Sequence, residues 1–212
     1  MRHNPKYEVT DEGVVRRLIA EHPWATIVSH HDGEMVASHY PILTDDSAED
    51  LTILTHVGRP DEKLHDLGSS EVVVIVAGPH GYISPSWYTD QVAPVPTWNF
   101  SVAHCYGTPE ILDPDENLRV LTHLVEHFER HVDDPMLLDR EVGARIAKGT
   151  VGLRIPIARF VCKVKMSQGQ DDRTKAQVLE ALRQPGPYGS PELADDMERA
   201  LAEGNDPGLG SP

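Results

Sequence analysis

The sequence is poor in cysteine and in aromatic residues, and it has no long apolar run. Its two cysteines, Cys105 and Cys162, form no CxxC motif, so we expect two buried free thiols in a reducing compartment. No segment approaches the ~18 consecutive apolar residues that a membrane-spanning helix needs. The first ten residues also lack the apolar core of a signal peptide. These absences predict a cytoplasmic protein that does not use a membrane.

Basic residues are also scarce, with 19 Lys and Arg against 34 Asp and Glu and a net charge of −15. Strong, sequence-independent binding to DNA needs clustered cations that face phosphates. No helix-turn-helix signature, zinc-finger spacing or basic arm is present. We therefore expect no specific nucleic-acid partner.

Length and composition predict one globular domain over residues 1–184, followed by an acidic, flexible tail over residues 185–212. Within this tail, a short helix from Pro191 to Ala202 would fit the sequence. The domain itself reads as a series of hairpins with peripheral helices, which fits a closed antiparallel barrel. The expected strands are Ala25–Ser29, Glu34–Leu43 with a break or bend near Pro41, Leu51–Val57, Glu71–Ala77 buried on both faces, Val102–Leu112, and one or two strands in Thr150–Met166 broken by Pro156. The expected helices begin after Thr10 or Asp11, from Pro60, at Asp113-Pro114, at Met136 and at Asp171.

An aromatic and proline-rich stretch, residues 77–107, is the most unusual part of the chain. Its large aromatic side chains would bury more area than a solvated loop does. Prolines would stiffen the backbone that carries them. The stretch predicts either the wall of a pocket or a dimer seam, or else a long loop packed on its own domain. The residues concerned are Tyr82, Trp87, Tyr88, Trp98 and Phe100, with Pro79, Pro85, Pro94 and Pro96.

The same stretch carries a family resemblance. The segments GPHGYISPSWY (Gly78–Tyr88), VPTWNF (Val95–Phe100) and AHCYG (Ala103–Gly107) resemble the signature of PaiB-like proteins, described as FMN-binding negative transcriptional regulators. ATIVSHHDGEMVASHYPIL near the start and KVKMSQ near Lys165 extend the resemblance over roughly residues 4–183. The resemblance implies a β-rich α+β fold, a split β-barrel with peripheral helices, in a homodimer with cofactors at the interface. Relatives on this fold bind FMN, a deazaflavin or heme.

Candidate cofactor contacts follow from the resemblance and from residue chemistry. The strand-to-helix segment with Thr55, His56, Arg59 and Lys63 would take a flavin phosphate or heme propionates, because basic side chains suit anions. Indoles can flank a planar cofactor, and amides can both donate to it and accept from it. These considerations add His39, Trp87, Trp98, Asn99 and Gln168 as cofactor contacts. Lys163 and Lys165 alternate on a strand and would approach an anion from one face.

The chain departs from the family pattern after its third strand, where HVGRPDEKLHD replaces HVARANP. Asp61 and Glu62 enter where a flavin phosphate would sit, which disfavours FMN. A branch of PaiB-like proteins, the piperazate synthases, consists of heme enzymes that close N5-hydroxyornithine into a cyclic hydrazine. This resemblance predicts heme b, with His65 as the iron ligand and His56 as the second choice. Arg59, Lys163 and Lys165 would then bind the N-hydroxylated amino acid as catalytic residues.

The first functional hypothesis is thus a heme-dependent enzyme of secondary metabolism that forms an N–N bond. The alternatives are an FMN-binding PaiB-like regulator and a flavin or deazaflavin oxidoreductase that acts on a small molecule. A further pattern, His123, His127 and His131 at four-residue spacing, lies beside the apolar face of a helix. We interpret it as a solvated or packing stripe, since no cysteine or clear carboxylate ligand joins it.

Overall fold

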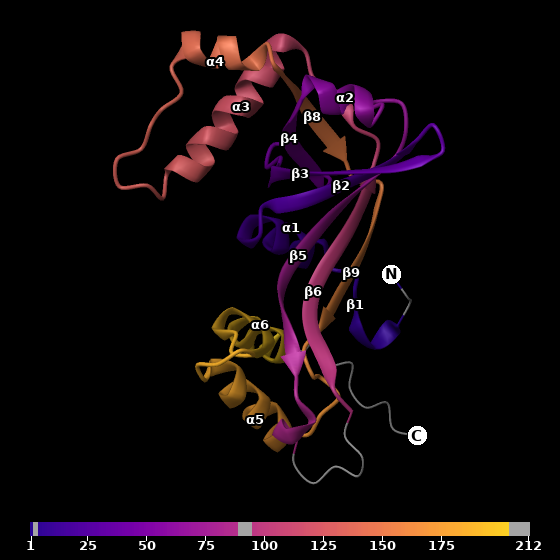
Figure 1. The fold of residues 1–212 in the computed structure, drawn as a ribbon, viewed down its shortest axis with the longest axis vertical. Helices are drawn as coiled ribbons and strands as arrows, with labels where there is room; N and C mark the ends of the chain where they lie inside the picture. The colour runs from indigo at the N-terminus through magenta and orange to yellow at the C-terminus, as the bar shows by residue number, and fades with distance from the viewer. Residues whose placement is uncertain (2–3, 89–94, 204–212) are drawn as a thin grey trace. The chain divides into compact units, whose positions relative to one another are not determined.

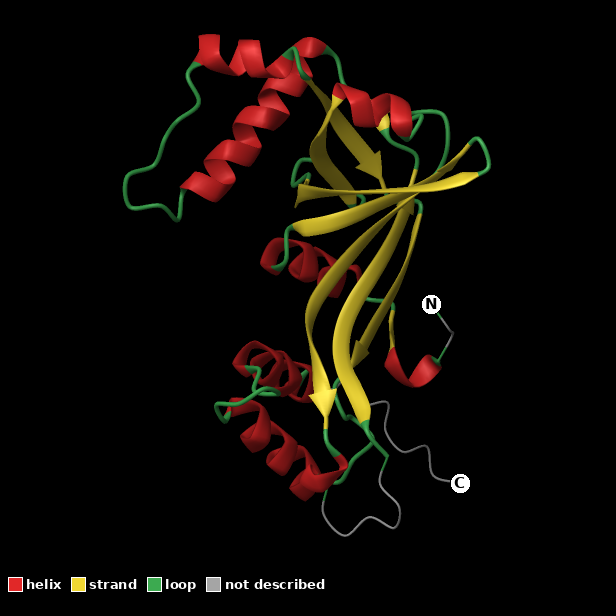
Figure 2. Ribbon diagram, in the orientation of Figure 1, coloured by secondary structure: helices red, strands yellow, loops and turns green. Residues whose placement is uncertain are grey.

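Alternating apolar residues and tight turns fold this chain into an antiparallel sheet with helices beside it. The computed structural model describes residues 1, 4–88 and 95–203. Among these residues, nine strands are hydrogen-bonded in the order β1-β9-β6-β5-β2-β3-β4-β8-β7 (Figures 1 and 2). The β-rich α+β class expected from the sequence is confirmed.

The chain divides into two units. The larger unit comprises Asp11–Val76 and His104–Phe160, and the smaller comprises Met1–Thr10, Ala77–Ala103 and Val161–Pro212. Three strands contribute residues to both units, namely β5 (Val72–Ile83), β6 (Thr97–Gly107) and β9 (Arg159–Lys165). Residues 185–203, expected as part of a separate tail, are grouped with the smaller unit, and residues 204–212 lie outside the described residues.

The larger unit holds most of the sheet and four helices. Its remaining elements are α1 (Glu12–Glu21), β2 (Trp24–His31), β3 (Glu34–Thr44), β4 (Thr52–Gly58), α2 (Arg59–Leu64), β7 (Glu110–Ile111), α3 (Pro114–Glu129), α4 (Arg140–Ala147) and β8 (Thr150–Pro156). Helices α1, α3 and α4 each have an aspartate as N-cap, and α4 begins at Arg140 rather than at the expected Met136. The carboxylate of Asp11 accepts from the amide of Gly13 at 2.8 Å, and that of Asp113 from the amide of Glu116 at 2.8 Å.

A long hairpin of β2 and β3 forms the middle of the larger unit (Figure 2). Asp32 and Gly33 turn the chain with positive φ of 50° and 84°, as the Asp-Gly pair predicts. The expected break or bend at Pro41 takes the form of a change of partner. β3 pairs with β2 as far as Pro41 and with β4 from Ile42 onward. Proline suits this point because it has no amide to donate to a continuing ladder.

Strand β5 differs from the expectation in its burial. Val72, Val74 and Val76 are buried, whereas Val73 and Ile75 are half-buried. The prediction of burial on both faces is therefore wrong, because an antiparallel strand can present one face to the core and leave the other more open.

The aromatic stretch is also more regular than a loop. β5 continues to Ile83, and β6 begins at Thr97, so Tyr82, Trp98 and Asn99 stand on strands. Pro94 lies outside the described residues.

Helix α3 packs its apolar side onto the larger unit's strands. Val120 and Leu124 form one buried cluster with Leu43, Leu54 and Leu112. The spacing of four residues between Val120 and Leu124 puts both on one face of the helix. Phe128, four residues after Leu124, is 37% exposed near the end of the helix.

The smaller unit adds short elements and two packed helices. These elements are η1 (Pro5–Tyr7), β1 (Glu8–Val9), η2 (Pro85–Trp87), α5 (Asp172–Arg183) and α6 (Pro191–Ala202). Helix α6 buries Leu193, Ala194, Met197 and Ala200. The short helix expected over Pro191–Ala202 is therefore present with these bounds, and it packs through one apolar face. The spacing of these four residues supplies the apolar stripe that an acidic composition alone conceals. Each helix of the described ranges is too short or too polar to serve as a membrane span.

Candidate functional site

The segment that departs from the family pattern, residues 56–66, is called the connector here. It runs from the end of β4 through α2 to His65, which caps the C-terminal end of that helix. It lies wholly in the larger unit, beside the β2–β3 hairpin. Six of the predicted site residues belong to this unit: His39, Thr55, His56, Arg59, Lys63 and His65.

His65 is buried, with 2% of its surface exposed. The hydroxyl of Ser29 lies 2.7 Å from its Nδ1, and the hydroxyl of Ser38 lies 3.0 Å from its Nε2. A neutral imidazole has one donor and one acceptor nitrogen, and two hydroxyls satisfy both. Burial lowers the pKa of His65, while the charge of Asp61 opposes that shift. The ring is therefore neutral at pH 7 and fully hydrogen-bonded within the protein.

Asp61 is held by the hairpin. The phenol of Tyr40 donates a short hydrogen bond to its Oδ2. This bond, together with one from Ser38 and the charge of His65, lowers the pKa of Asp61 against the opposing effect of burial. Burial, the hydrogen bond to Asp61 and its charge raise the pKa of Tyr40 to about 12. The carboxylate thus faces β3 and the Ser38–His65 pair, and serine hydroxyls rather than a carboxylate bond both nitrogens of His65.

The two cations of the connector, Arg59 and Lys63, are exposed to solvent. The guanidinium Nε of Arg59 donates to the carbonyl of Lys148 at 2.7 Å. Its Nη1 lies 3.8 Å from the carboxylate of Glu62, and about half of the Arg59 side chain is exposed. Lys63 is exposed on the same short helix. Arg59 and Lys63 can therefore meet an anion from solvent.

Thr55 and His56 are neighbours on β4, so their side chains point to opposite faces of the sheet. The hydroxyl of Thr55 donates to the carbonyl of Pro41 at 2.7 Å, so this group is committed to the sheet. The ring of His56 is half-buried, and its Nδ1 is buried without a hydrogen-bond partner among the described residues. Burial lowers the pKa of His56, which keeps the ring neutral.

His39 lies on β3 between Ser38 and Tyr40, and alternation along the strand turns it to the other face. There it stacks on Trp24, with ring centroids 6.4 Å apart and planes inclined by 18°. Trp24 is 62% exposed. The structure therefore separates His39 from the face on which α2 lies, and pairs it with an aromatic residue that the sequence did not single out.

The other predicted site residues belong to the smaller unit: Trp87, Trp98, Asn99, Lys163, Lys165 and Gln168. Trp98 is 53% exposed and lies against His80 and Tyr82, each with a centroid distance of 6.3 Å. Trp87 ends the short helix η2 and is half-buried. Trp98, His80 and Tyr82 thus form an aromatic cluster on the smaller unit.

The two amides are bound internally. Asn99 is fully buried and donates from Nδ2 to the hydroxyl of Ser167 at 2.9 Å. Gln168 accepts from the amide of Met166 at 2.8 Å and donates to the carbonyl of Val164 at 2.5 Å. Ser167, which accepts the bond from Asn99 and precedes Gln168 in the chain, has a positive φ of 59°. Asn99 and Gln168 thus hold an unusual turn after β9.

Lys163 and Lys165 stand on β9 in alternating positions. Lys163 is buried and is the register partner of Glu8 on β1. Lys165 forms a short hydrogen bond with the hydroxyl of Thr97, and its ammonium lies 5.8 Å from the ring centroid of Tyr7. Burial lowers the pKa of Lys165.

Sequence reasoning missed the hydroxyl residues Ser29, Ser38 and Tyr40. Ser38 and Tyr40 recur at two-residue spacing on one strand, which places both on one face. That spacing could have identified Ser38 and Tyr40 as a pair on one face, but only the position of the connector shows what their hydroxyls contact. Their partners, His65 and Asp61, are 27 and 21 residues away in the chain.

Comparison with known proteins agrees with this fold. Residues 1–159 match the family model described as "Putative FMN-binding domain". The protease synthase and sporulation protein PAI 2 of Bacillus subtilis is 30% identical over 203 residues, covering 93% of this chain and 97% of that protein.

Two solved structures share the fold at low sequence identity. The FAD and heme binding protein of Mycobacterium smegmatis has a TM-score of 0.58 at 18% identity and covers 75% of this chain and 73% of its own. A flavocytochrome of Azotobacter vinelandii has a TM-score of 0.61 at 16% identity, with 80% and 75% covered. Such neighbours are flavin-binding split-barrel proteins. With a family model that matches three quarters of its length and a PaiB relative along nearly all of it, the chain belongs to the PaiB-like family of split-barrel proteins with an FMN-binding domain.

Proposed function

We propose that this protein binds flavin mononucleotide and that Arg59 and Lys63 of the connector contact its phosphate. The observation that carries the proposal is the hydrogen bond between Tyr40 and Asp61. From the sequence, Asp61 was expected to repel a phosphate at the connector. Its carboxylate keeps its charge but is bound to Tyr40 of β3, so Asp61 has a structural role in the connector and the objection to FMN is weakened.

The charges left at the connector suit a phosphate monoester. Glu62 is within 3.8 Å of Arg59 and partly offsets its charge, but Lys63 has no carboxylate within salt-bridge distance among the described residues. A guanidinium and an ammonium together can bind a phosphate through charge-assisted hydrogen bonds. Bound flavin would supply one- or two-electron redox chemistry. The chain's own part is to anchor the phosphate and to hold the connector against β3 through Asp61 and His65.

A comparison of FMN with riboflavin tests the proposal, because the two differ by the phosphate. Flavin fluorescence is titrated with the purified full chain, and we expect FMN to bind more tightly than riboflavin. Lys63→Gln and Arg59→Gln should each weaken FMN binding by about tenfold and leave riboflavin binding unchanged. Arg145→Gln, an exposed arginine on α4, is the matched control. Equal affinity for FMN and riboflavin, or an unchanged FMN affinity in both variants, would refute the phosphate contact.

The heme-dependent cyclisation of N5-hydroxyornithine to piperazate is the second candidate. The observation that favours it is His56, a neutral half-buried imidazole whose Nδ1 has no partner among the described residues. Iron binds neutral imidazole, and such a ring can be recruited without breaking a hydrogen bond. His65 is less suited, because a bond to iron would displace a serine hydroxyl from one of its nitrogens.

An absorption spectrum separates the two candidates. The purified protein is mixed with heme, which has a Soret band at about 400 nm when it is bound. A Soret band that is lost in His56→Ala but kept in His65→Asn would support the heme enzyme. Protein that shows only flavin bands after exposure to both cofactors would exclude it.

The regulator role and the homodimer remain parts of the proposal to be tested separately. A DNase footprint on the promoter of its own gene at nanomolar protein would support regulation, against the expectation from a net charge of −15. Light scattering at micromolar protein tests the dimer, and a monomer would remove any site shared between two copies.

A further inference from the structure

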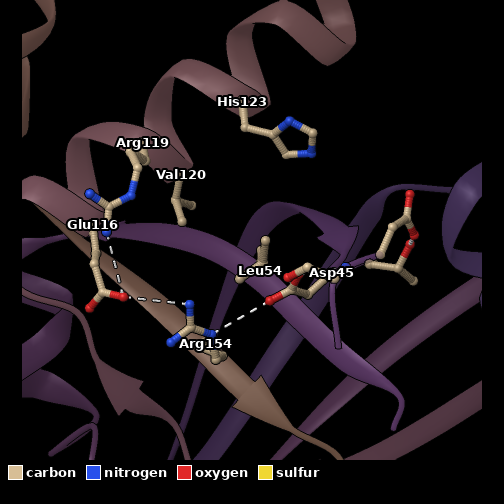
Figure 3. Close-up of a pocket in the computed structure, with 10 residues that line it drawn as sticks. Asp45, Leu54, Glu116, Arg119, Val120, His123 and Arg154 are labelled. Atoms are coloured by element: carbon tan, nitrogen blue, oxygen red, sulfur yellow. Dashed lines mark hydrogen bonds and ion pairs between the residues drawn. The ribbon is translucent and has the colours of Figure 1, made fainter. Parts of the chain in front are cut away.

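Three cavities of the larger unit meet at one residue of α3, His123. The first, of about 320 Å³, is shown in Figure 3, where His123 and Val120 project from α3 above the strand that carries Leu54. A second, of about 530 Å³, lies between α3 and α4. The third, of about 440 Å³, lies between α1, α3 and the end of β3. Their charges differ, and this difference identifies the cavity that can take a ligand.

In the first cavity the cations are neutralised by the protein. Arg154 lies 3.5 Å from Asp45 and 3.6 Å from Glu116, and Arg119 lies 3.7 Å from Glu116 (Figure 3). The second cavity has two arginines, Arg119 and Arg140, and two carboxylates, Asp115 and Glu126. Neither cavity has an excess of positive charge.

The third cavity is basic in an otherwise acidic protein. Three arginines and two histidines line it with one carboxylate, and Leu43 and Ala20 give it an apolar wall. The charged and titratable residues are Arg16, Arg17, Arg130, His123, His127 and Asp46. Arg16 is paired with Glu12 at 2.7 Å. With 34 acidic and 19 basic residues in the chain, such a local excess runs against the composition.

Arg130 is a cation of this cavity whose side chain has two neutral rings as hydrogen-bond partners. Its Nη2 lies 3.2 Å from Nε2 of His127, and its Nε donates to His131 at 3.1 Å. Both partners are imidazoles, and no carboxylate of the described residues lies within salt-bridge distance of it. Burial lowers the pKa of His127, and Arg130, His123 and His131 lower it further, whereas Asp46 acts in the opposite direction. Positive groups therefore already disfavour a proton on His127.

We propose that this cavity is a binding site for a small dianionic oxyanion with an apolar body, bound by Arg130 together with His127 and His123. A guanidinium binds phosphate and carboxylate oxygens through paired hydrogen bonds, and imidazoles add further donors. The apolar wall of Leu43 and Ala20 accommodates the rest of the molecule. A phosphate monoester and an aromatic dicarboxylate share this chemistry. The proposal does not depend on the flavin or heme site, because none of these residues belongs to the connector.

The pH dependence of binding has a definite sign. A bound dianion favours protonated histidine, so the pKa of His127 rises on binding. The groups that face His127 are His123 on α3, Arg130 and His131 just after that helix, Arg16 and Arg17 on α1, and Asp46 after β3. Of these, only Asp46 is negative. Affinity should therefore increase as the pH falls from 8 to 6, and the increase should be lost in His127→Gln.

The test uses the full chain and isothermal titration with phenyl phosphate, phthalate and the neutral control benzyl alcohol. We expect saturable binding of one of the two dianions at one site per chain, and no binding of the alcohol. Which dianion binds more tightly distinguishes the phosphate from the dicarboxylate source. Arg130→Gln should weaken binding about tenfold, and Asp46→Asn should strengthen it about threefold.

Arg145→Gln, outside the cavity, should leave the affinity unchanged. A gain of affinity in Asp46→Asn cannot come from a general loss of structure, so it separates binding from folding. Flavin titration of the same variants should be unaffected, which keeps this result independent of the cofactor. Binding that does not saturate, or that is equal in wild type and Arg130→Gln, would overturn the proposal.

Discussion

The phenol of Tyr40 on β3 donates a hydrogen bond to the carboxylate of Asp61 on α2, and through this bond the connector is attached to the hairpin. This hydrogen bond shifts the pKa of both residues. The pKa of Asp61 is lowered, chiefly by this bond, and that of Tyr40 is raised to about 12. An acidic residue that the sequence places beside a cofactor phosphate is therefore a structural residue of the connector.

Tyr40→Phe should lower the free energy of unfolding by ~1–3 kcal/mol, because it removes the phenol donor from the part-buried carboxylate of Asp61. The loss is measured by urea unfolding at pH 7. Since the folded pKa of Asp61 lies below its ordinary 3.8, the stabilisation is present above that pH and declines as the pH falls through the lower, folded value. The difference between wild type and variant should shrink over the same range. Tyr188→Phe, at an exposed tyrosine, should have no effect.

His65→Asn should cost about 2–3 kcal/mol at pH 8, because two hydrogen bonds of a buried side chain are lost. Its folded pKa is lowered from 6.5, so the unfolded chain takes up the proton first. The contribution of His65 is complete above pH 6.5 and decreases as the pH falls toward the folded pKa. Wild type and variant should converge in stability below pH 6.5. His30→Asn, an exposed histidine on β2, is the control at pH 8, and a wild-type stability for His65→Asn would contradict the buried network.

Gly107→Ala should be strongly destabilising. A Cβ at this end of β6 would lie 2.2 Å from the carbonyl oxygen of Pro156, and the backbone there cannot move without disturbing the sheet. We expect a loss of ~2 kcal/mol or more, in the range of overpacking effects. Gly149→Ala is the matched control, since its Cβ would meet nothing closer than 3.5 Å. Thermal unfolding of both variants compares them directly.

Helix α6 should depend on packing rather than on charge. Met197 is fully buried, and Met197→Ala should lower the free energy of unfolding by about 2–5 kcal/mol through the cavity that it leaves. Arg183 pairs with Asp195 and Glu198 at 2.9 and 2.8 Å, but all three are exposed at the surface. Arg183→Gln should therefore cause no measurable loss in urea unfolding. A larger loss of stability in Arg183→Gln than in Met197→Ala would show that the ion pairs hold α6 in place.

Local signals in the sequence determined much of the fold. Asp11, Asp113 and Asp171 each begin a helix because a carboxylate satisfies free amides of the first turn. The Asp32-Gly33 pair specifies the hairpin because both residues tolerate positive φ. Such features depend on a few neighbouring residues. The motifs of residues 77–107 likewise identified the family without any knowledge of contacts.

The candidate site depended on contacts between distant residues, which the sequence leaves open. Thr55 and His56 are adjacent in the chain, yet alternation along β4 turns them to opposite faces. From the sequence, His65 was expected to bind iron and Asp61 to repel a phosphate, whereas in the folded chain Ser29 and Ser38 bond His65 and Tyr40 bonds Asp61.

The basic cavity also depends on contacts between residues that are distant in the chain. It forms only where α1, α3 and the end of β3 meet, so the histidine stripe on α3 gave no sign of its arginine partners on α1. Composition and periodicity determined which elements form. Only the tertiary structure decided which charges are neutralised inside the protein and which remain available to a ligand, because that depends on the groups that folding brings together.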